Sequence, residues 1–214
     1  MKNILLIGLG RFGRHAARKL HELGHQVLAV DRDEQNVNAA LPYTASALIG
    51  DSTNPEFLAT LGVETFDVCV VAIGDNFQSS LETTALLKEC GAKFIVSRAS
   101  RDVQEKLLLN NGADEVVYPE RQLAEWAAIC YSSDYILDYI AVGEDFSVYE
   151  IRIPEKWVGR SLTGLNIRRR YRINVIALKR EGRILADIEP DSPLPGDVTL
   201  LVIGRDADVQ RMLR

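Results

Sequence analysis

The feature that most constrains this chain is a glycine-rich turn between an apolar run and a helical pattern. The apolar run is Ile4-Leu5-Leu6-Ile7, within an expected strand over residues 2–7, and the spacing Gly8-x-Gly10-x-x-Gly13 follows it directly. Asp31 ends the next apolar run, 18 residues after Gly13. Glycines at this spacing are weak evidence alone. A strand before them, a helix after them and an acid at this distance are together typical of a dinucleotide-binding unit.

Each residue of this motif has an expected role. Gly8 allows the tight turn, Gly10 allows the backbone to approach a phosphate, and Gly13 allows the helix to pack close to the strand. The helix N-terminus offers N–H groups and a positive dipole end to phosphates. Arg11 lies where a cation has a phosphate partner. Asp31 can accept hydrogen bonds from a ribose diol and would repel a 2′-phosphate, which argues against NADP.

The composition is that of an ordinary globular protein, with 47% apolar and 26% charged residues. The net charge of −5 argues against a general nucleic-acid or anionic-membrane binder. No apolar run approaches the roughly 18 residues of a membrane span, and a strand near the N-terminus leaves no room for a signal peptide. Three cysteines without a C-x-x-C spacing indicate reduced core thiols. We therefore expect a cytoplasmic protein.

Residues 1–118 alternate between expected strands and helices. Strands are expected at residues 2–7, 27–30, 45–49, 67–73, 94–97 and 116–118, with a helix after each of the first five. Most of these strands are continuous apolar runs, as expected when helices cover both faces of a sheet. The pattern predicts an α/β fold with a Rossmann-like, doubly wound parallel sheet.

The pattern changes after Pro119. A helix is expected over residues 120–131, and residues 134–147 are expected to form a connection. The remainder predicts a small α+β module, with a hairpin turn at Glu181-Gly182. Its strands are expected at residues 148–153, 173–179, 183–188 and 198–203, and its helices near residues 165–171 and 206–213. The expected domains are residues 1–133 and 148–214, joined by residues 134–147.

A ligand of an open α/β sheet lies outside the carboxyl ends of the strands. Beyond the glycine-rich turn and its Phe12, these ends carry Asp31, Arg32, Asp51, Ser52, Thr53, Ile73, Gly74, Asn76, Arg98 and Glu120. Two other interpretations stay open. Asp51 and Asn76 also suit helix caps, and Arg98 and Glu120 also suit a solvated ion pair.

Catalytic arrangements are missing from the sequence. The only histidines are His15, His21 and His25, and none lies at a later strand end, where a dehydrogenase would place its proton donor. No Tyr-x-x-x-Lys pair, G-x-S-x-G, H-E-x-x-H or P-loop spacing occurs. The sequence therefore predicts a nucleotide site without a reaction.

Two further patterns lie after Pro119. The basic run 168–172 is typical of a solvated helix face, or it forms a second anion site. Six apolar residues recur at helical spacings and predict one long stripe: Leu123, Trp126, Ile129, Ile136, Leu137 and Ile140. The stripe either packs on the chain's own sheet or forms a dimer contact.

Six short segments resemble a known family. Residues 8–13, 50–53 and 72–76 resemble the RCK (KTN, TrkA-N) domain of potassium-channel and potassium-transporter regulators, and the third segment adds Ala72 to the candidate site. Residues 159–162, 165–168 and 173–182 resemble the TrkA-C (RCK-C) domain. One copy of each domain in a chain of this length is similar to a KtrA-type regulatory subunit.

The resemblance implies a homo-oligomer built from dimers, an octameric gating ring beneath a membrane potassium-translocating subunit. It implies that ATP or ADP binds each TrkA-N domain and sets the shape of the ring. Glu120 matches an acid near the terminal phosphates and a divalent cation, Mg²⁺ or Ca²⁺. Some RCK-C domains of this type bind cyclic di-AMP, and that site would fall on Leu162, Arg168, Asn174, Val175, Ile176 and Pro190.

The glycine motif alone favours NAD(H) as the ligand. Arg11, Arg98 and Arg121 are three candidate cations that suit a triphosphate better, so together with the resemblance they favour ATP or ADP. The expected function is regulation of potassium uptake from the inner face of the membrane. The alternatives are a small NAD-dependent oxidoreductase and an RCK regulator of a different cation transporter.

Overall fold

The computed structural model describes residues 1–213, and the chain divides into two compact units, Met1–Arg121 and Gln122–Arg214. The sequence places the end of the first domain later, at residue 133. The difference arises at helix α6 (Pro119–Tyr131), because Ile129 and Cys130 near its end pack into the core of the second unit.

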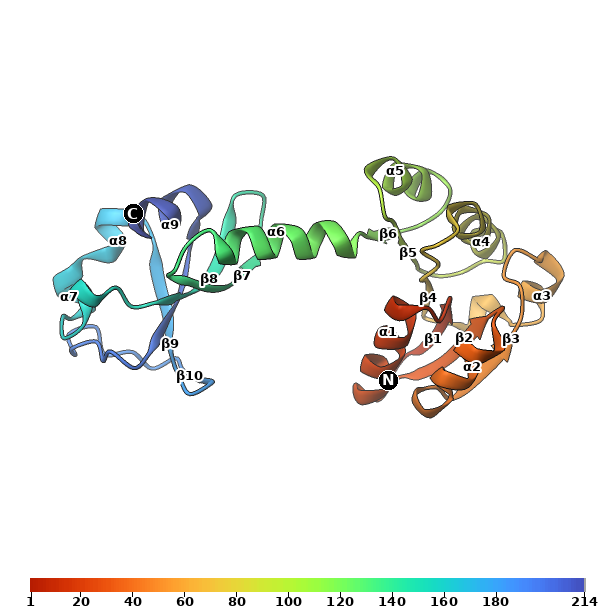
Figure 1. Cartoon of the computed structure of the whole chain (residues 1–214), viewed down its shortest axis with the longest axis horizontal. Helices are drawn as coiled ribbons and strands as arrows, with labels where there is room; N and C mark the ends of the chain where they lie inside the picture. The colour runs from red at the N-terminus through yellow and green to blue at the C-terminus, as the bar shows by residue number, and fades with distance from the viewer. Residues whose placement is uncertain (214) are drawn as a thin grey trace. The chain divides into compact units, whose positions relative to one another are not determined.

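The first unit is built on six parallel strands in the order β3-β2-β1-β4-β5-β6 (Figure 1). The strands are β1 (Asn3–Ile7), β2 (Gln26–Asp31), β3 (Ser46–Ile49), β4 (Val68–Val71), β5 (Ile95–Arg98) and β6 (Glu115–Val117). The helices between them are α1 (Arg11–Glu22), α2 (Glu34–Ala40), α3 (Pro55–Ala59), α4 (Phe77–Glu89) and α5 (Asp102–Asn110). The predicted doubly wound sheet is confirmed, and its order reverses between β1 and β4.

Alternate residues of β1 supply the two faces of this sheet. Ile4 and Leu6 pack with Ala17 of α1 and residues of α2. Leu5 packs on the opposite face with Leu58 of α3 and residues of α4. Every one of these strand side chains is buried. The strands are therefore the apolar runs that a sheet covered on both faces requires.

The second unit carries a five-stranded antiparallel sheet in the order β10-β9-β11-β8-β7. Its strands are β7 (Ile136–Ala141), β8 (Phe146–Arg152), β9 (Asn174–Arg180), β10 (Arg183–Leu185) and β11 (Thr199–Arg205). The hairpin predicted at Glu181-Gly182 joins β9 to β10, and both turn residues have positive φ. The predicted α+β module is confirmed.

Two expectations about the second unit are wrong. Residues 134–147 are not a plain connection, because residues 136–141 form β7 and pair with β8. The short helix expected near residues 165–171 is two helices, α7 (Leu162–Leu165) and α8 (Ile167–Tyr171). The break occurs at Asn166, whose φ of 50° is left-handed and interrupts a right-handed helix.

The predicted apolar stripe is also interrupted. Trp126 and Ile129 lie on α6, whereas Ile136 and Ile140 lie on strand β7 with its period of two. Trp126, Ile129 and Ile136 belong to the core of the second unit, while Leu123 and Ile140 are exposed. The stripe is therefore partly the packing of the unit on its own sheet.

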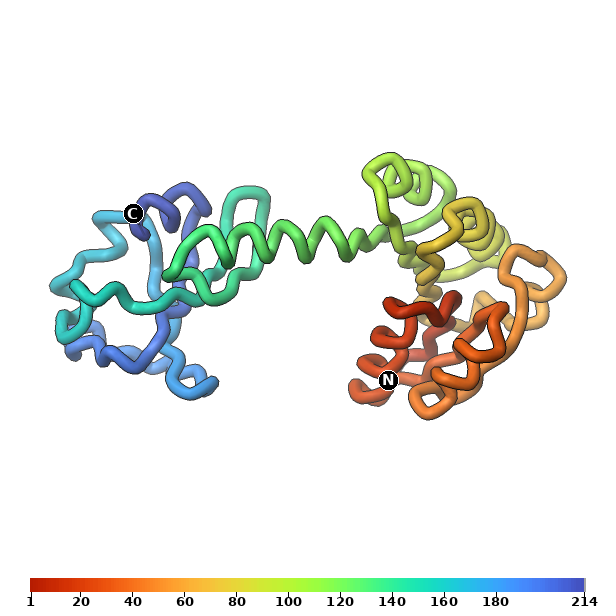
Figure 2. The backbone as a smooth tube through the Cα atoms, in the orientation of Figure 1, coloured from red at the N-terminus to blue at the C-terminus, as the bar shows by residue number. Residues whose placement is uncertain are grey.

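Helices α8 and α9 (Asp206–Leu213) come from distant parts of the sequence and lie side by side (Figure 2). Val209 and Met212 of α9 are buried against the core that includes Ile167 of α8. Tyr149 of β8 donates a 2.8 Å hydrogen bond to Asp206, and burial together with this bond raises the pKa of the tyrosine. The end of the described chain is thus anchored to the sheet.

None of the helices in residues 1–213 combines the length and the apolar character that crossing a bilayer requires.

Candidate functional site

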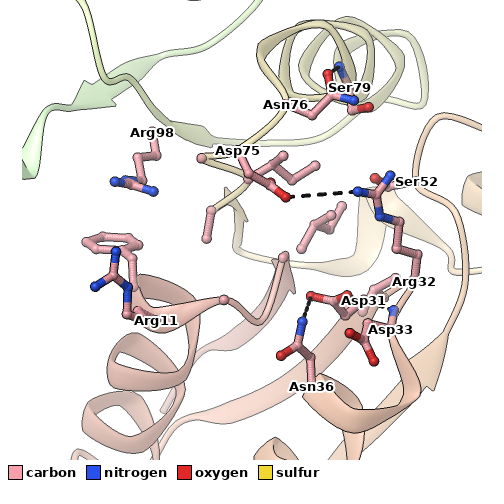
Figure 3. Close-up of a pocket in the computed structure, with 18 of the residues that line it drawn as sticks. Arg11, Asp31, Arg32, Asp33, Asn36, Ser52, Asp75, Asn76, Ser79 and Arg98 are labelled. Carbon is pink, nitrogen blue, oxygen red and sulfur yellow. Dashed lines mark hydrogen bonds and ion pairs between the residues drawn. The ribbon is translucent and has the colours of Figure 1, made fainter.

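A cavity of about 750 Å³ lies in the first unit, at the carboxyl ends of its strands (Figure 3). It is lined by fourteen of the sequence-predicted residues: Gly8, Gly10, Arg11, Phe12, Asp31, Arg32, Asp51, Ser52, Ala72, Ile73, Gly74, Asn76, Arg98 and Glu120. Gly13 and Thr53 do not line it. Four polar residues of the lining were not predicted as site residues: Asp33, Asn36, Asp75 and Ser79.

The glycine-rich turn is shaped by backbone geometry. Gly8 has a φ of 92°, which L side chains rarely adopt. A Cβ on Gly13 would overlap the carbonyl oxygen of Gly8, whereas a Cβ on Gly10 would meet nothing within 4 Å. Gly13 therefore brings helix α1 close to the turn, as expected, and Gly10 leaves its space to the cavity.

The carboxylate of Asp31 is held in place by three donors. Oδ2 accepts 2.6 Å and 3.4 Å hydrogen bonds from the backbone N–H of Leu9 and the amide of Asn36, and Oδ1 accepts a 2.8 Å bond from the N–H of Asp33. Asn36 in turn accepts a 3.1 Å bond from Arg14 of α1. A carboxylate oxygen has about two lone-pair sites, so Asp31 still has room to accept from a ligand.

The loop after β3 is folded by its own side chains. Asp51 Oδ1 accepts from both the N–H and the hydroxyl of Thr53, at 2.9 and 2.7 Å. These two bonds, with a smaller contribution from Arg32, lower the pKa of Asp51. Asn54, not Asp51, caps helix α3. The cap interpretation of Asp51 is therefore wrong.

Buried hydroxyls join α4 to this loop and to the sheet. Ser52 and Thr83 are linked by their hydroxyls at 2.8 Å, and Thr84 and Ser97 are linked in the same way at 2.8 Å. All four side chains are buried. Ser52 also lines the cavity, and its position there is held by the hydrogen bond to Thr83 of α4. No motif in the sequence predicts this bond.

Asn76 caps the N-terminus of helix α4, as one interpretation of the sequence suggested, and it also lines the cavity. Its side chain accepts a 3.1 Å hydrogen bond from the N–H of Ser79 and caps α4. Beside it, Asp75 lies 3.9 Å from Arg32 in an exposed ion pair that joins the ends of β4 and β2 (Figure 3). A pair this exposed contributes at most about 1 kcal/mol.

Arg98 at the end of β5 is the most enclosed cation in the lining. It forms an ion pair with Glu120, and its guanidinium carbon lies 5.7 Å from the centre of the Phe12 ring. A Cβ on Gly74 would overlap Nη1 of Arg98, so the guanidinium lies directly over this glycine. Its Nε is buried and has no hydrogen-bond partner in the described structure. The expected ion pair of Arg98 and Glu120 is present, but the arginine is largely enclosed rather than solvated.

Charge is distributed unevenly around the cavity. Arg11 and Arg98 lie at one side (Figure 3), where Arg98 also pairs with Glu120. Asp31, Asp33 and Asn36 lie at the other side, beside Arg32, which pairs with Asp75. The cationic side suits phosphates. The side with Asp31 suits a polyhydroxyl group such as ribose.

Comparison with known proteins identifies the family. Residues 4–119 match the model of the TrkA-N domain, and residues 148–214 match that of the TrkA-C domain. This chain belongs to the TrkA-N/TrkA-C family. Ktr system potassium uptake protein C of Bacillus subtilis (strain 168) is 39% identical over 98% of this chain and 95% of that protein. Ktr system potassium uptake protein A of the same organism is 35% identical over the same shares.

Solved structures share the fold of this TrkA-N/TrkA-C chain. The GsuK channel bound to NAD has a TM-score of 0.67 and 18% identity, over 97% of this chain and 38% of that one. The GsuK bound to ADP has a TM-score of 0.52 and 20% identity, over 63% of this chain and 36% of that one. These structures support the fold, and the two family models confirm the resemblance inferred from the sequence for both domains.

Arg121 does not supply a cation to the TrkA-N cavity. Its guanidinium donates to both oxygens of Glu105, at 2.8 and 3.1 Å, and lies 3.3 Å from Asp102. The hydrogen bond from Arg121 is the largest cause of a lowered pKa of Glu105. The expectation that three arginines serve a triphosphate is thus reduced to Arg11 and Arg98.

The metal prediction for Glu120 lacks supporting ligands in the described residues. Nowhere in residues 1–213 do three or more histidine, cysteine or acidic side chains form a group that could hold a metal ion. Mg²⁺ and Ca²⁺ prefer several oxygen ligands, and the single carboxylate of Glu120 already pairs with Arg98. A metal at Glu120 stays a prediction.

The residues expected to bind cyclic di-AMP lie on three elements and a loop of the TrkA-C unit. Arg168, Asn174, Ile176 and Pro190 are exposed, and Leu162 and Val175 are partly buried. Thr163, next to Leu162, donates to the carbonyl of Pro190 at 3.0 Å, which brings those two segments together. Cyclic di-AMP as the effector of this unit stays a prediction.

Proposed function

We propose that this protein is a nucleotide-sensing regulatory subunit of a membrane potassium-uptake system. The relatives named as Ktr potassium uptake proteins match it over nearly their whole length, which supports potassium as the ion. ATP or ADP would occupy the TrkA-N cavity. The protein would lie in the cytoplasm, held at the inner face of the membrane by its partner.

The observation that carries this proposal is the division of charge around the cavity. An adenine nucleotide presents phosphates at one end and a ribose in the middle, and the lining offers Arg11 and Arg98 to the first and Asp31 to the second.

NAD(H) is the second ligand to consider, because a GsuK channel of the same fold is described as bound to NAD and another GsuK structure as bound to ADP. Arg11 has no acidic partner among the ion pairs of the described residues, and this cation at one side of the cavity favours the larger charge of ADP or ATP. Mass spectrometry of the nucleotide released from freshly purified protein tests the choice directly. Recovery of NAD(H) alone would replace ATP and ADP with NAD(H) as the sensed ligand.

Regulation needs a conformational equilibrium rather than a chemical step. A nucleotide that binds two shapes of a homo-oligomer unequally shifts their populations, and a few kcal/mol of differential affinity is enough. We propose that the oligomer is a ring of dimers. This ring would be coupled to a potassium translocator, although the same arrangement would serve a different cation transporter.

Light scattering and small-angle X-ray scattering test this model. We expect a mass well above the 23.8 kDa of one chain and scattering curves that differ between ATP and ADP. A monomer at tens of micromolar, or superimposable curves with the two nucleotides, contradicts the sensing model. Turnover of NAD with candidate alcohols would instead favour the oxidoreductase alternative.

A further inference from the structure

A second hollow in the TrkA-N unit lies between α1 and the segment that carries Ala39 of α2 and Tyr43. It has a volume of about 140 Å³ and is lined by Arg11, Arg14, His15, Arg18, Ala39 and Tyr43. The first four of these residues lie on α1, where Arg14, His15 and Arg18 follow Arg11 by three, four and seven residues. They therefore share one face of α1. No sequence motif marked this basic hollow.

The arginines of the basic hollow are not neutralised by acids. In the described part of the chain, none of the ion pairs involves Arg11, Arg14 or Arg18. By contrast, Lys19 on the same helix pairs with Glu22 at 3.1 Å. Three uncompensated guanidiniums in a chain of net charge −5 form a local concentration of positive charge that favours an anion.

Neutral groups hold two of these guanidiniums in place. Arg14 donates a 3.1 Å hydrogen bond to the side-chain oxygen of Asn36. Arg18 donates a 3.1 Å bond to the hydroxyl of Tyr43, and its guanidinium carbon lies 4.7 Å from the centre of that ring. These contacts orient the cations but leave their charge available. Part of the ordering cost of binding an anion is therefore already met.

We propose that the basic hollow is a binding site for a phosphate-class oxyanion. Guanidinium groups match the geometry of phosphate oxygens and bind them through charge-assisted hydrogen bonds. At about 30 Å³ for each water-sized group, the hollow holds about five such groups, enough for one tetrahedral oxyanion. It is too small for a whole nucleotide. The ligand is inorganic phosphate or a single phosphate group of a larger molecule.

Arg11 connects this site to the nucleotide site, because it lines both cavities. If a nucleotide occupies the larger cavity, as proposed above, its terminal phosphates and the oxyanion compete for one guanidinium. The oxyanion then binds more weakly to the ATP-bound protein than to the AMP-bound protein. Local phosphate would thereby oppose binding of the triphosphate.

The test measures binding of inorganic phosphate to full-length protein stripped of nucleotide, through the ³¹P line width of phosphate at constant ionic strength. Arg18→Gln is the main variant because Arg18 lines only the basic hollow. Since it removes a charge-assisted hydrogen bond, it should weaken phosphate binding by at least about tenfold. Lys19→Gln is the matched control, with the same loss of charge on the same helix, and should leave phosphate binding unchanged.

Three results would overturn the proposal: no saturable binding of phosphate, unchanged binding in Arg18→Gln, or equal weakening in Arg18→Gln and Lys19→Gln. Unchanged binding in Arg18→Gln would place phosphate at another site, such as the glycine-rich turn. Equal weakening in both variants would mean that the loss of phosphate affinity reflects only the change in net charge. Thermal unfolding of each variant checks that it is folded. Repeating the titration with phosphoserine, in place of inorganic phosphate, separates free phosphate from a phosphate carried by a larger molecule.

Failure of the proposed nucleotide function has a separate signature. In that case ATP and AMP would not bind, while inorganic phosphate would still bind and still depend on Arg18.

Discussion

The carboxylate of Asp31 and the backbone N–H of Leu9 are joined by a hydrogen bond of 2.6 Å. This bond ties the end of β2 to the middle of the glycine-rich turn. The residue expected to contact ribose is therefore also one of the residues that hold the phosphate-binding turn in shape. Substitution of Asp31 should affect both ends of a bound nucleotide.

Replacing Asp31 with alanine should weaken ATP and ADP binding by about 1.5–3 kcal/mol, the cost of losing hydrogen bonds to a charged group. The N–H of Leu9 also loses its acceptor. The affinity for AMP should therefore fall as well. Isothermal titration calorimetry checks this. Glu34→Ala is the matched control, since Glu34 is an acid in the first turn of α2 outside the cavity lining. Equal affinities for wild type and Asp31→Ala would remove Asp31 from the ribose site.

Arg11 should distinguish nucleotides by the number of their phosphates. It opens α1 directly after the glycine-rich turn, at the cationic side of the cavity. Arg11→Ala should lower ATP affinity by about 1.5–3 kcal/mol and AMP affinity much less. Calorimetry with AMP, ADP and ATP measures the trend. If AMP and ATP lose the same affinity, Arg11 does not face the terminal phosphates.

Two glycines of the same turn should respond differently to alanine. Gly13→Ala places a Cβ against the carbonyl of Gly8, and such overpacking costs about 1–3 kcal/mol or more. Gly10→Ala meets no atom within 4 Å and should fold normally, yet it should bind nucleotide more weakly because its methyl group enters the cavity. Urea unfolding and calorimetry measure both effects. Loss of folding in Gly10→Ala, or normal stability in Gly13→Ala, would contradict this view of the turn.

The thiol of Cys69 should make the first unit less stable at high pH. Burial in β4 raises its pKa from 9.0 to about 12. The unfolded chain therefore loses the thiol proton at a lower pH than the folded chain. The contribution of the protonated thiol to the free energy of unfolding is fully present below pH 9 and is lost as the pH rises toward 12. By pH 10 the loss is about 1.4 kcal/mol. Between pH 8 and 10, the free energy of unfolding measured with urea should fall less steeply for Cys69→Ala than for wild type. Parallel curves for the two proteins would show that the Cys69 thiol does not cause the pH dependence.

The sheet of the first unit was predictable because its strands are buried on both faces and its glycines mark the turns. Strand β7 was not predictable, because two apolar residues of the segment 136–141 differ in burial: Ile136 is buried and Ile140 is exposed. The spacing of these residues also continues the helical spacing of α6. Only pairing with β8, a contact that the sequence does not display, decides in favour of a strand.

The candidate site shows the same limit. Residues at strand ends were predictable from topology, whereas Asn36 and Ser79 lie within helices α2 and α4 and enter the lining through tertiary packing. Arg121 illustrates the opposite error. Its charge and place suggested a phosphate ligand, but Glu105 on α5 binds it instead. Which acid an arginine meets depends on packing between helices, and the sequence pattern does not encode that directly.

The position of the Arg98 guanidinium over Gly74 has a consequence for how this cavity can change. An alanine at position 74 would displace the guanidinium of Arg98, and an arginine at position 98 keeps this conformation only with a glycine opposite it. The two positions, on neighbouring strand ends, are therefore coupled, because a side chain at position 74 moves the end of the arginine and not the backbone, and this movement disturbs the ion pair with Glu120. A shorter side chain at position 98 would lose the same ion pair and would leave room for a side chain at position 74.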